Sequence, residues 1–306
     1  MLAMIRRAIR ALIPAPLLFY LSAISHFFQS LGNQSLLFPS NDVGQKILVT
    51  SWLNLCRQGV VLPLHQVGFK VFSQFEEDGI LLYLFTIVGV TNARVVELCA
   101  GNGLECMSTN LIVHHGWRGF LFDGSAERVR EGIRFFERFP STFQFPPSFQ
   151  RAWITRENIN SLLATSGVKG EIDLLSIDID GNDLWIWKEI REVSPRVLIV
   201  ETNNSIPADR ALSIPYDPQF GASDNPSLPH DFRGASALAF VRMSRAKGYR
   251  LIGAHRYGFN LIFMRNDVGA AEFAEVDVQS VHDNDFTRWN QQKWTELASC
   301  DWVEIV

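Results

Sequence analysis

The segment from Val95 to Asp123 constrains the fold of this chain more than any other stretch. It contains a short apolar strand, Val95–Leu98, a loop with glycines at positions 101 and 103, a helix expected over 105–115, and a second strand that ends in Asp123. Glycine lets the backbone adopt positive φ and approach a ligand closely. Ligands of parallel sheets bind beyond the carboxyl ends of the strands, and an acid about 20 residues after such a loop commonly holds ribose hydroxyls. The segment therefore predicts the nucleotide-binding half of a Rossmann-like α/β domain.

Short apolar runs alternate with helical patterns along most of the remaining chain. Ser73 followed by Glu76 has the form of a capping box and predicts that a helix begins at Ser73. Further strands are expected over 149–154, 172–179, 196–200, 249–252 and 260–264, with helices over 127–139, 156–164, 185–192 and 235–247. Such alternation predicts a parallel sheet covered by helices on both faces, a three-layer sandwich. The link between the last two strands is too short for a parallel crossover, so these strands should form an antiparallel hairpin.

Composition indicates a globular protein and suggests its location. Hydrophobic residues make up 47% of the chain and charged residues 20%, which is ample apolar material for a core. We expect a hydrophobic leader and loop over 1–45, an α/β domain with an N-terminal helical extension over 46–266, and a tail over 267–306. The net charge is −4 without long basic runs, so nucleic acid is not an expected partner. The four cysteines match no zinc or redox spacing and fit reduced thiols in the cytoplasm.

The N-terminal residues leave three interpretations open. Three arginines precede an apolar run, Ala11–Ile24, which two prolines interrupt. The arrangement is similar to a signal peptide, but the run is shorter than the roughly 20 apolar residues of a membrane-spanning helix. It could be an export signal, a membrane-surface segment or a helix packed on the domain. We favour the last two, and therefore a cytoplasmic protein with peripheral membrane contact through residues 1–28.

A second group of acids follows the strand expected over 172–179. Asp178 and Asp180 point to the same face of a strand, and Asp183 follows closely. Clustered carboxylates are costly to leave unpaired. Glu201 and Asn203 end the neighbouring strand, so Asp178, Asp180, Glu201 and Asn203 together could form an all-oxygen Mg²⁺ site. The alternative is a metal-free active-site rim in which one of the acids is a general base.

Two other nucleotide-binding motifs fit poorly. A dinucleotide fingerprint would place a third glycine at position 106, where the chain has Cys106, so a nicotinamide cofactor is disfavoured. The chain has no Gly-x-x-x-x-Gly-Lys-Ser/Thr sequence, which excludes a P-loop.

The motifs as a whole resemble those of a known family. Residues 97–103 resemble motif I of class I S-adenosylmethionine-dependent methyltransferases, and Asp123 matches their ribose-binding acid. Residues 73–80, 173–183, 200–203 and 247–249 are similar to the FkbM-type group, and the resemblance covers about residues 70–266. Cys99 departs from it, because motif I usually has its first glycine there. The resemblance implies a mostly parallel seven-stranded sheet with a terminal antiparallel hairpin.

The resemblance also implies S-adenosylmethionine as the cofactor and assigns residues to it. The expected cofactor-binding residues are Glu97, Ala100, Gly101, Gly103, Asp123, Trp153 and Asp178. Glu97 is expected near the methionine end. Trp153 either stacks on the adenine or packs in the core, and the sequence favours neither. Gln74 and Glu77 are further candidates near the site.

Methyl transfer requires an aligned acceptor and removal of a proton. Asp178, Asp180 and His230 are the candidate catalytic residues, although His230 could equally be a surface residue. It lies in a long loop, 204–233, which we expect to cover the acceptor. The chain is thus expected to methylate a hydroxyl of a small-molecule or glycan acceptor. A methyltransferase-like protein that binds without catalysis is the alternative, and a nicotinamide-dependent oxidoreductase is less favoured.

Overall fold

The computed structural model describes residues 40–221 and 229–306, so the predictions made for residues 1–28 lie outside the described residues. The chain divides into two compact units, residues 1–46 and 47–306, and the second contains the whole sheet. This unit therefore includes residues 267–306, which the sequence pattern sets apart as a tail. The described helices are α3 (Ser40–Arg57), η1 (Leu64–Gln66), α4 (Glu77–Val88), α5 (Thr109–His115), α6 (Ala126–Phe136), α7 (Pro140–Phe143), α8 (Ile159–Thr165), α9 (Asp183–Glu189), α10 (Ala237–Ala246), α11 (Val278–His282), α12 (Asp285–Asn290), η2 (Gln291–Lys293) and α13 (Trp294–Leu297).

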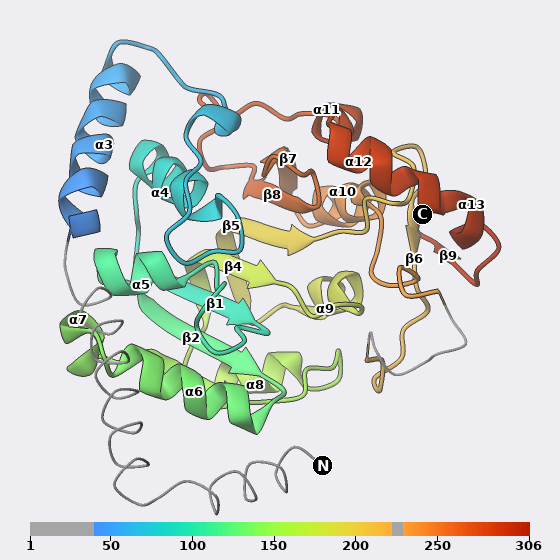
Figure 1. Cartoon of the computed structure of the whole chain (residues 1–306), viewed down its shortest axis with the longest axis horizontal. Coiled ribbons are helices and arrows are strands. Elements are labelled where there is room, and N and C mark those ends of the chain that lie inside the picture. Colours follow the sequence, from blue (N-terminus) through green and yellow to red (C-terminus); the bar gives the residue numbers. More distant parts are fainter. Residues whose placement is uncertain (1–39, 222–228) are drawn as a thin grey trace, which may run out of the picture. The chain divides into compact units, whose positions relative to one another are not determined.

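The main sheet has seven strands in the order β3-β2-β1-β4-β5-β8-β7 (Figure 1). Strands β1 to β5 are parallel, and β8 runs antiparallel to both β5 and β7, which confirms the mostly parallel sheet and its terminal hairpin. A separate antiparallel pair joins β6 to β9. The strands are β1 (Arg94–Leu98), β2 (Arg118–Asp123), β3 (Ser148–Arg151), β4 (Gly170–Ile177), β5 (Val193–Glu201), β6 (Leu212–Ser213), β7 (Tyr249–Ala254), β8 (Asn260–Arg265) and β9 (Val303–Glu304).

Two hydrophobic layers cover the sheet, one on each face. Successive strand residues point to opposite faces, so Val95 packs with α4, α5 and α6, whereas Val96 packs with α8, α9 and α10. The three-layer sandwich predicted from the alternating pattern is thus confirmed. No helix within residues 40–221 and 229–306 is long and apolar enough to cross a membrane.

The strand order changes direction between β1 and β4. The chain proceeds from β1 to β2 and β3 on one side, then returns to add β4 and β5 on the other. The loops after β1 and β4 therefore leave the sheet in opposite directions, and open α/β sheets bind their ligands beyond the strand ends at this point. The fold places the glycine loop and the Asp178 group at this edge.

The helix start predicted at Ser73 is wrong. Helix α4 begins at Glu77 because the Asp78 carboxylate holds the preceding turn: it accepts hydrogen bonds from the backbone N–H groups of residues 71, 72 and 73 at 2.6–2.8 Å. The Ser73 hydroxyl donates to the same carboxylate and accepts from the N–H of Asp78 in the first turn of α4. The N-cap residue is nevertheless Glu76, whose side chain makes no capping bond. The serine caps of α6 and α10, Ser125 and Ser236, lie where a local pattern places them, whereas here a buried acid overrides the pattern.

The helix expected to begin at Glu105 also begins later. Glu105 has a φ of 58°, a left-handed conformation that no α-helix contains. The backbone N–H groups of Met107 and Ser108 donate to the Glu97 carboxylate, and α5 begins only at Thr109. Smaller shifts occur at α8, which begins at Ile159 instead of residue 156, and at α9, which begins at Asp183 instead of residue 185.

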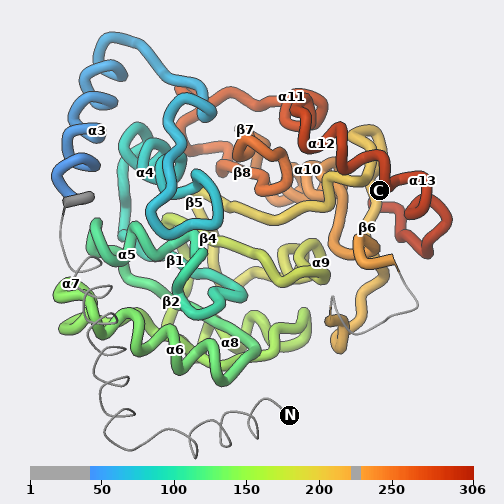
Figure 2. The backbone as a smooth tube through the Cα atoms, viewed as in Figure 1, coloured from blue at the N-terminus to red at the C-terminus, as the bar shows by residue number. Residues whose placement is uncertain are grey.

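The C-terminal helices lie beside the loop that follows β5 (Figure 2). The Asn204 side chain donates to the Thr287 hydroxyl at 2.9 Å and accepts from the Asn290 amide at 2.6 Å. These contacts attach α12 to the carboxyl end of β5. Residues that follow the sheet in sequence therefore contribute to the same edge as the glycine loop.

Candidate functional site

Three cavities open beyond the carboxyl ends of the strands. The loop cavity, about 350 Å³, is lined by Gln74, Cys99, Ala100, Gly101, Asn102, Leu104, Glu105, Arg128, Asp178 and Asp180. The tryptophan cavity, about 70 Å³, is lined by Cys99, Gly124, Ala152, Trp153, Ile154, Ile179, Asn182 and Phe220. The acidic cavity, about 260 Å³, is lined by Gln74, Asp180, Gly181, Asp183, Glu201, Thr202, Asn203, Asn204, Asp231, Arg233, Gly234, Phe259, Phe286, Trp289, Asn290 and Lys293. Gln74 and Asp180 line both the loop cavity and the acidic cavity, and Cys99 lines both the loop cavity and the tryptophan cavity. The three cavities therefore adjoin one another.

Backbone strain is concentrated around the loop cavity. Cys99, Glu105 and Asp180 have φ values of 68°, 58° and 59°, and all three line this cavity. Only one other non-glycine residue of the described chain, Ala93, has a positive φ. Each such conformation costs about 1–3 kcal/mol and persists where the surrounding structure enforces it, typically at ligand sites. The left-handed φ at position 99 also explains why a glycine would suit that position.

Three predicted cofactor residues, Glu97, Asp123 and Gly103, fix the conformation of the glycine loop and line none of the three cavities. The buried Glu97 carboxylate accepts from Met107 N–H at 2.8 Å and from Ser108 N–H at 2.9 Å. Asp123 accepts from Gly101 N–H at 3.0 Å. At Gly103 an added Cβ would lie 2.9 Å from the Phe135 ring. These residues shape the loop, and their contact with a cofactor stays a prediction, whereas Ala100, Gly101 and Asp178 line the loop cavity directly.

Trp153 lies at the surface edge of the tryptophan cavity. It is 56% exposed, so it is not a core residue, and its indole N–H donates to the Pro218 carbonyl at 2.7 Å. The Trp153 side chain borders the cavity together with Ala152 and Phe220. The side chain is therefore available to stack on a planar group, which stays the prediction made from sequence.

Described residues of the long loop after β5 line two of the cavities, and its expected role as a cover over the acceptor stays a prediction. Phe220 lines the tryptophan cavity, and Asn182 donates to the Asp217 carbonyl at 2.7 Å. A Cβ at Gly181 would lie 2.3 Å from the Phe220 ring, so glycine is required there for this close approach. Asp231 and Arg233, at the other end of the loop, line the acidic cavity.

The structure does not bring His230 into this site. Its side chain is 76% exposed and lies 3.8 Å from Asp231 Oδ1, outside the linings of all three cavities. Glu77 is also buried away from the cavities, where it accepts from Phe75 N–H and from the Asn260 amide. Gln74, in contrast, lines both the loop cavity and the acidic cavity. A catalytic role for His230 has no geometric support here.

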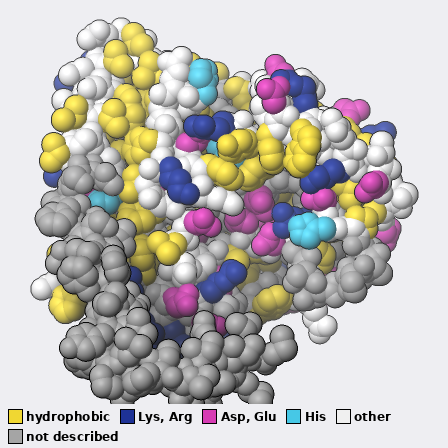
Figure 3. Space-filling view, in the orientation of Figure 1, with side chains coloured by type: hydrophobic (Ala, Val, Ile, Leu, Met, Phe, Trp, Pro, Cys, Tyr) yellow, Lys and Arg dark blue, Asp and Glu magenta, His cyan; other side chains and the backbone are white. Residues whose placement is uncertain are grey.

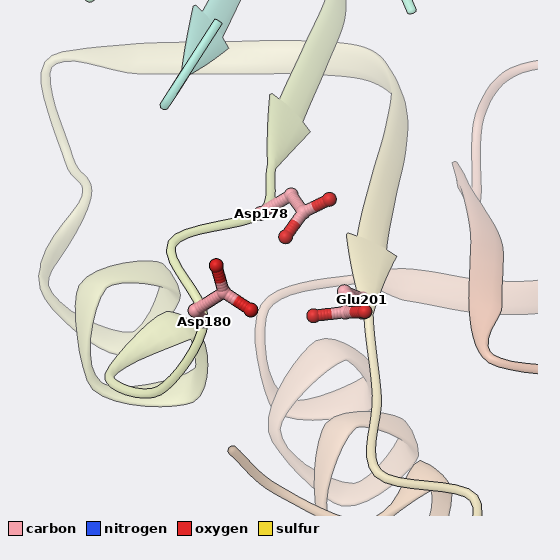
Figure 4. A group of neighbouring side chains, drawn as sticks. All are labelled: Asp178, Asp180 and Glu201. Atoms are coloured by element: carbon pink, nitrogen blue, oxygen red, sulfur yellow. The ribbon is translucent and has the colours of Figure 1, made fainter. Parts of the chain in front are cut away.

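Three carboxylates meet where the loop cavity adjoins the acidic cavity (Figure 4). Asp178 follows β4, Asp180 lies in the next turn, and Glu201 ends β5, with one oxygen of each within 4.8 Å of the others. The Asp178 and Glu201 carboxyls share a hydrogen bond. Burial, and then the charge of Glu201, raise the pKa of Asp178 well above its usual range, and burial also raises the pKa of Glu201. The pair consequently retains one proton at a pH where ordinary carboxyls have lost theirs.

Other groups near the cluster have structural roles. Arg233 Nη1 lies 2.7 Å from Asp180 Oδ1, so a fixed cation already faces the cluster. Burial raises the pKa of Asp183 to about 6, and its oxygens accept from Ile179 and Gly181 N–H groups, which shapes the turn after β4. Asn203, predicted as a metal ligand, lines the acidic cavity, where its side-chain oxygen accepts from Ser205 and its amide donates to two loop carbonyls. Its role as a ligand stays a prediction.

Aromatic and basic side chains complete the acidic cavity, and sequence reasoning missed most of them. Phe259, Phe286 and Trp289 lie on one side, and Lys293 lies beside Trp289. In Figure 3 acidic side chains gather near the centre of the face, next to hydrophobic and basic ones. The only sequence signal for this wall is the recurrence of tryptophan in an otherwise polar C-terminal stretch.

No family model and no curated protein matches the chain. Among solved structures, the N-terminal domain of EvdMO1 with SAH bound is 14% identical with a TM-score of 0.42, and covers 65% of this chain and 90% of that chain. An O-methyltransferase from Bacillus cereus in complex with SAH is 13% identical, TM-score 0.39, over 71% of this chain and 88% of that chain. A TehB-like SAM-dependent methyltransferase from Corynebacterium glutamicum is 11% identical, TM-score 0.34, over 73% and 98%. Likenesses this distant carry no conclusion about the chemistry of this chain.

Proposed function

We propose that this chain is an S-adenosylmethionine-dependent methyltransferase of the FkbM-like group that methylates a hydroxyl of a small-molecule or glycan acceptor. The loop cavity is the observation that supports this proposal most. It lies at the switch point of the sheet, follows a glycine loop, and contains strained residues that a ligand site would retain. It also adjoins a second cavity at a half-buried pair of acids, Asp178 and Glu201.

The described residues fit the cofactor in two adjoining places. The backbone of Ala100 and Gly101 and the Asp178 side chain would hold the amino-acid and ribose portions in the loop cavity. At Gly101 an added Cβ would meet only one atom within 4 Å, so the backbone there is open to a ligand. Trp153 and Phe220 would enclose the adenine in the tryptophan cavity, which shares Cys99 with the loop cavity. When bound, the cofactor supplies a methyl group that its sulfonium already activates.

The acid pair would receive the acceptor proton. Asp178 lines the loop cavity and Glu201 lines the acidic cavity, so the pair lies between the two proposed binding places. The bound cofactor would supply the methyl group to the acceptor oxygen and keep the electron pair of the carbon–sulfur bond, while residues of this chain would orient the acceptor and take up its proton. The hydroxyl proton passes to the ionised carboxylate of the pair. Asp180 pairs with Arg233 and would position that arginine near the acceptor.

Binding of the product cofactor tests the proposal independently of the acceptor. S-adenosylhomocysteine at about 100 times its Kd should raise Tm by about 5 °C, since a ligand that binds only the folded state stabilises it by about 2.7 kcal/mol. Trp153→Ala should weaken this binding about tenfold because the stacking surface is lost. Trp289→Ala is the matched control: it is equally exposed but lines the acidic cavity, and its binding should be unchanged. Stabilisation by NAD but not by S-adenosylhomocysteine would overturn the assignment in favour of an oxidoreductase.

A second proposal is Mg²⁺ at the carboxylate cluster, which the close approach of Asp178, Asp180 and Glu201 supports. The ion would have to displace the shared proton and compete with Arg233. Its affinity should therefore rise as the pH rises through the elevated pKa of the pair. Calorimetry with Mg²⁺ at pH 6 and pH 8 measures this. If no heat is evolved at either pH and chelation leaves turnover unchanged, the metal proposal is wrong and Arg233 is the resident cation.

A further inference from the structure

The C-terminal helix α12 forms one wall of the acidic cavity with two aromatic rings. Trp289 is 56% exposed, which is unusual for tryptophan, and its ring centroid lies 5.8 Å from that of Phe286. The Phe286 ring in turn lies 5.7 Å from Phe259. We call these three rings the aromatic wall. An exposed aromatic surface beside a cavity is a common feature of ligand sites.

The Trp289 ring is held in place before any ligand arrives. Lys293 Nζ lies 5.1 Å from the centroid of the indole ring and 3.1 Å from Asp231 Oδ2. A cation over an aromatic face is attracted within about 6 Å. Asn204 attaches α12 to the loop after β5 through Thr287 and Asn290, as described above. A ring fixed in this way can bind a ligand without the entropic cost of ordering it.

The rest of the cavity is polar and predominantly acidic. Its lining includes Asp180, Glu201 and Asp231, together with the amide side chains of Gln74 and Asn290. A flat apolar ligand would leave these groups buried without partners, which is costly. The lining carboxylates, with Asp183 among them, outnumber the cavity's two cations, and each cation is already paired with a carboxylate, Arg233 with Asp180 and Lys293 with Asp231. An anionic ligand would therefore meet unfavourable charge. A neutral saturated ring suits both sides, because its C–H face can lie on the aromatic wall while hydroxyls on its edge bond to carboxylates and amides.

We propose that Phe286 and Trp289 form the platform on which a neutral polyhydroxylated ring of the acceptor lies, and that Trp289 is a specificity-determining residue. This inference rests on the proposed function, since it assumes that the acidic cavity receives the acceptor. The platform then lies on α12, far along the chain from the ends of β4 and β5 that carry the Asp178–Glu201 pair. The C-terminal residues thus supply acceptor recognition that the glycine-loop half of the domain lacks.

Ligand-observed NMR of the full chain saturated with S-adenosylhomocysteine tests the platform. The probes are methyl pyranosides of glucose, galactose, mannose and fucose, with catechol as a flat comparison. At least one pyranoside should bind better than catechol. Trp289→Ala should weaken its affinity about tenfold, the equivalent of about 1.4 kcal/mol, whereas Trp289→Phe should retain most of it. Phe143→Ala, at another exposed aromatic side chain that lines none of the three cavities, should leave the pyranoside affinity unchanged.

The possible outcomes separate this inference from the proposed function. If S-adenosylhomocysteine binds but no pyranoside does, or Trp289→Ala binds pyranosides as well as the wild type, the platform is wrong and the methyltransferase proposal stands. If S-adenosylhomocysteine itself does not bind, both are wrong. Circular dichroism of Trp289→Ala checks its fold. If the alanine variant is unfolded, Trp289→Phe keeps the test valid, because the phenylalanine variant must bind pyranosides nearly as well as the wild type does.

Discussion

Glu201→Gln is expected to lower methyl transfer by about 10²–10⁴-fold, the usual contribution of a general base, with little change in S-adenosylhomocysteine affinity. Glu201 and Asp178 form a half-buried hydrogen-bonded pair between the loop cavity and the acidic cavity. Glutamine keeps the size and hydrogen bonding of the side chain but cannot accept the acceptor proton as a carboxylate does. The rate of labelled methyl transfer from S-adenosylmethionine to the pyranosides measures the effect.

The pH profile provides a second readout. Burial raises the pKa of both carboxyls, so the pair loses its shared proton only as the pH rises through that elevated range. The base form, and therefore the rate, should increase over the same range, and Glu201→Gln should lose this limb. Glu296→Gln, an identical change at an exposed position on α13, should alter neither rate nor profile. A Glu201→Gln variant with the wild-type rate and pH profile would exclude the pair as the base.

Asp173→Ala is expected to lower the free energy of unfolding by about 3–5 kcal/mol, the cost of breaking a buried ion pair. Asp173 in β4 is fully buried and accepts from the N–H groups of Thr91, Asn92 and Ala93. It also pairs with Arg196 of β5 at 2.8 Å. Alanine would leave the guanidinium buried without its counter-ion and three backbone donors without an acceptor. Urea denaturation measures the change, and Asp301→Ala, at an exposed position, should be nearly neutral.

The pH dependence of stability identifies the same interaction. Burial raises the pKa of Asp173, but the Arg196 pair and the three N–H donors outweigh burial and hold the pKa below its usual value. The unfolded state therefore binds the proton more readily, and the stabilisation is present above about pH 3.9 and lost as the pH falls through the lower folded pKa. Asp173→Ala should remove this acid-sensitive part of the unfolding free energy. Equal acid sensitivity in the wild type and the variant would contradict the assignment.

Local patterns in the sequence determined the order of strands and helices. Apolar runs such as Val95–Leu98 predicted strands correctly because a buried parallel strand needs apolar residues on both faces. The short link before β8 predicted an antiparallel pair for an equally local reason, its length. The boundaries of α4 and α5 could not be predicted, because the Asp78 and Glu97 carboxylates bind backbone groups that only the folded chain brings to them.

The glycine loop and the acids at the strand ends were therefore readable from the sequence, since each depends on residues adjacent along the chain. Their roles were decided by the tertiary structure: Glu97 and Asp123 support the loop, and Asp178 pairs with Glu201 across two strands. Arg233 and Trp289 join the same site from distant segments. Hydrophobic periodicity does not predict such contacts between distant segments. They depend on the sheet topology, which decides which strand ends lie side by side, and on the hydrogen bonds that attach α12 to the loop after β5.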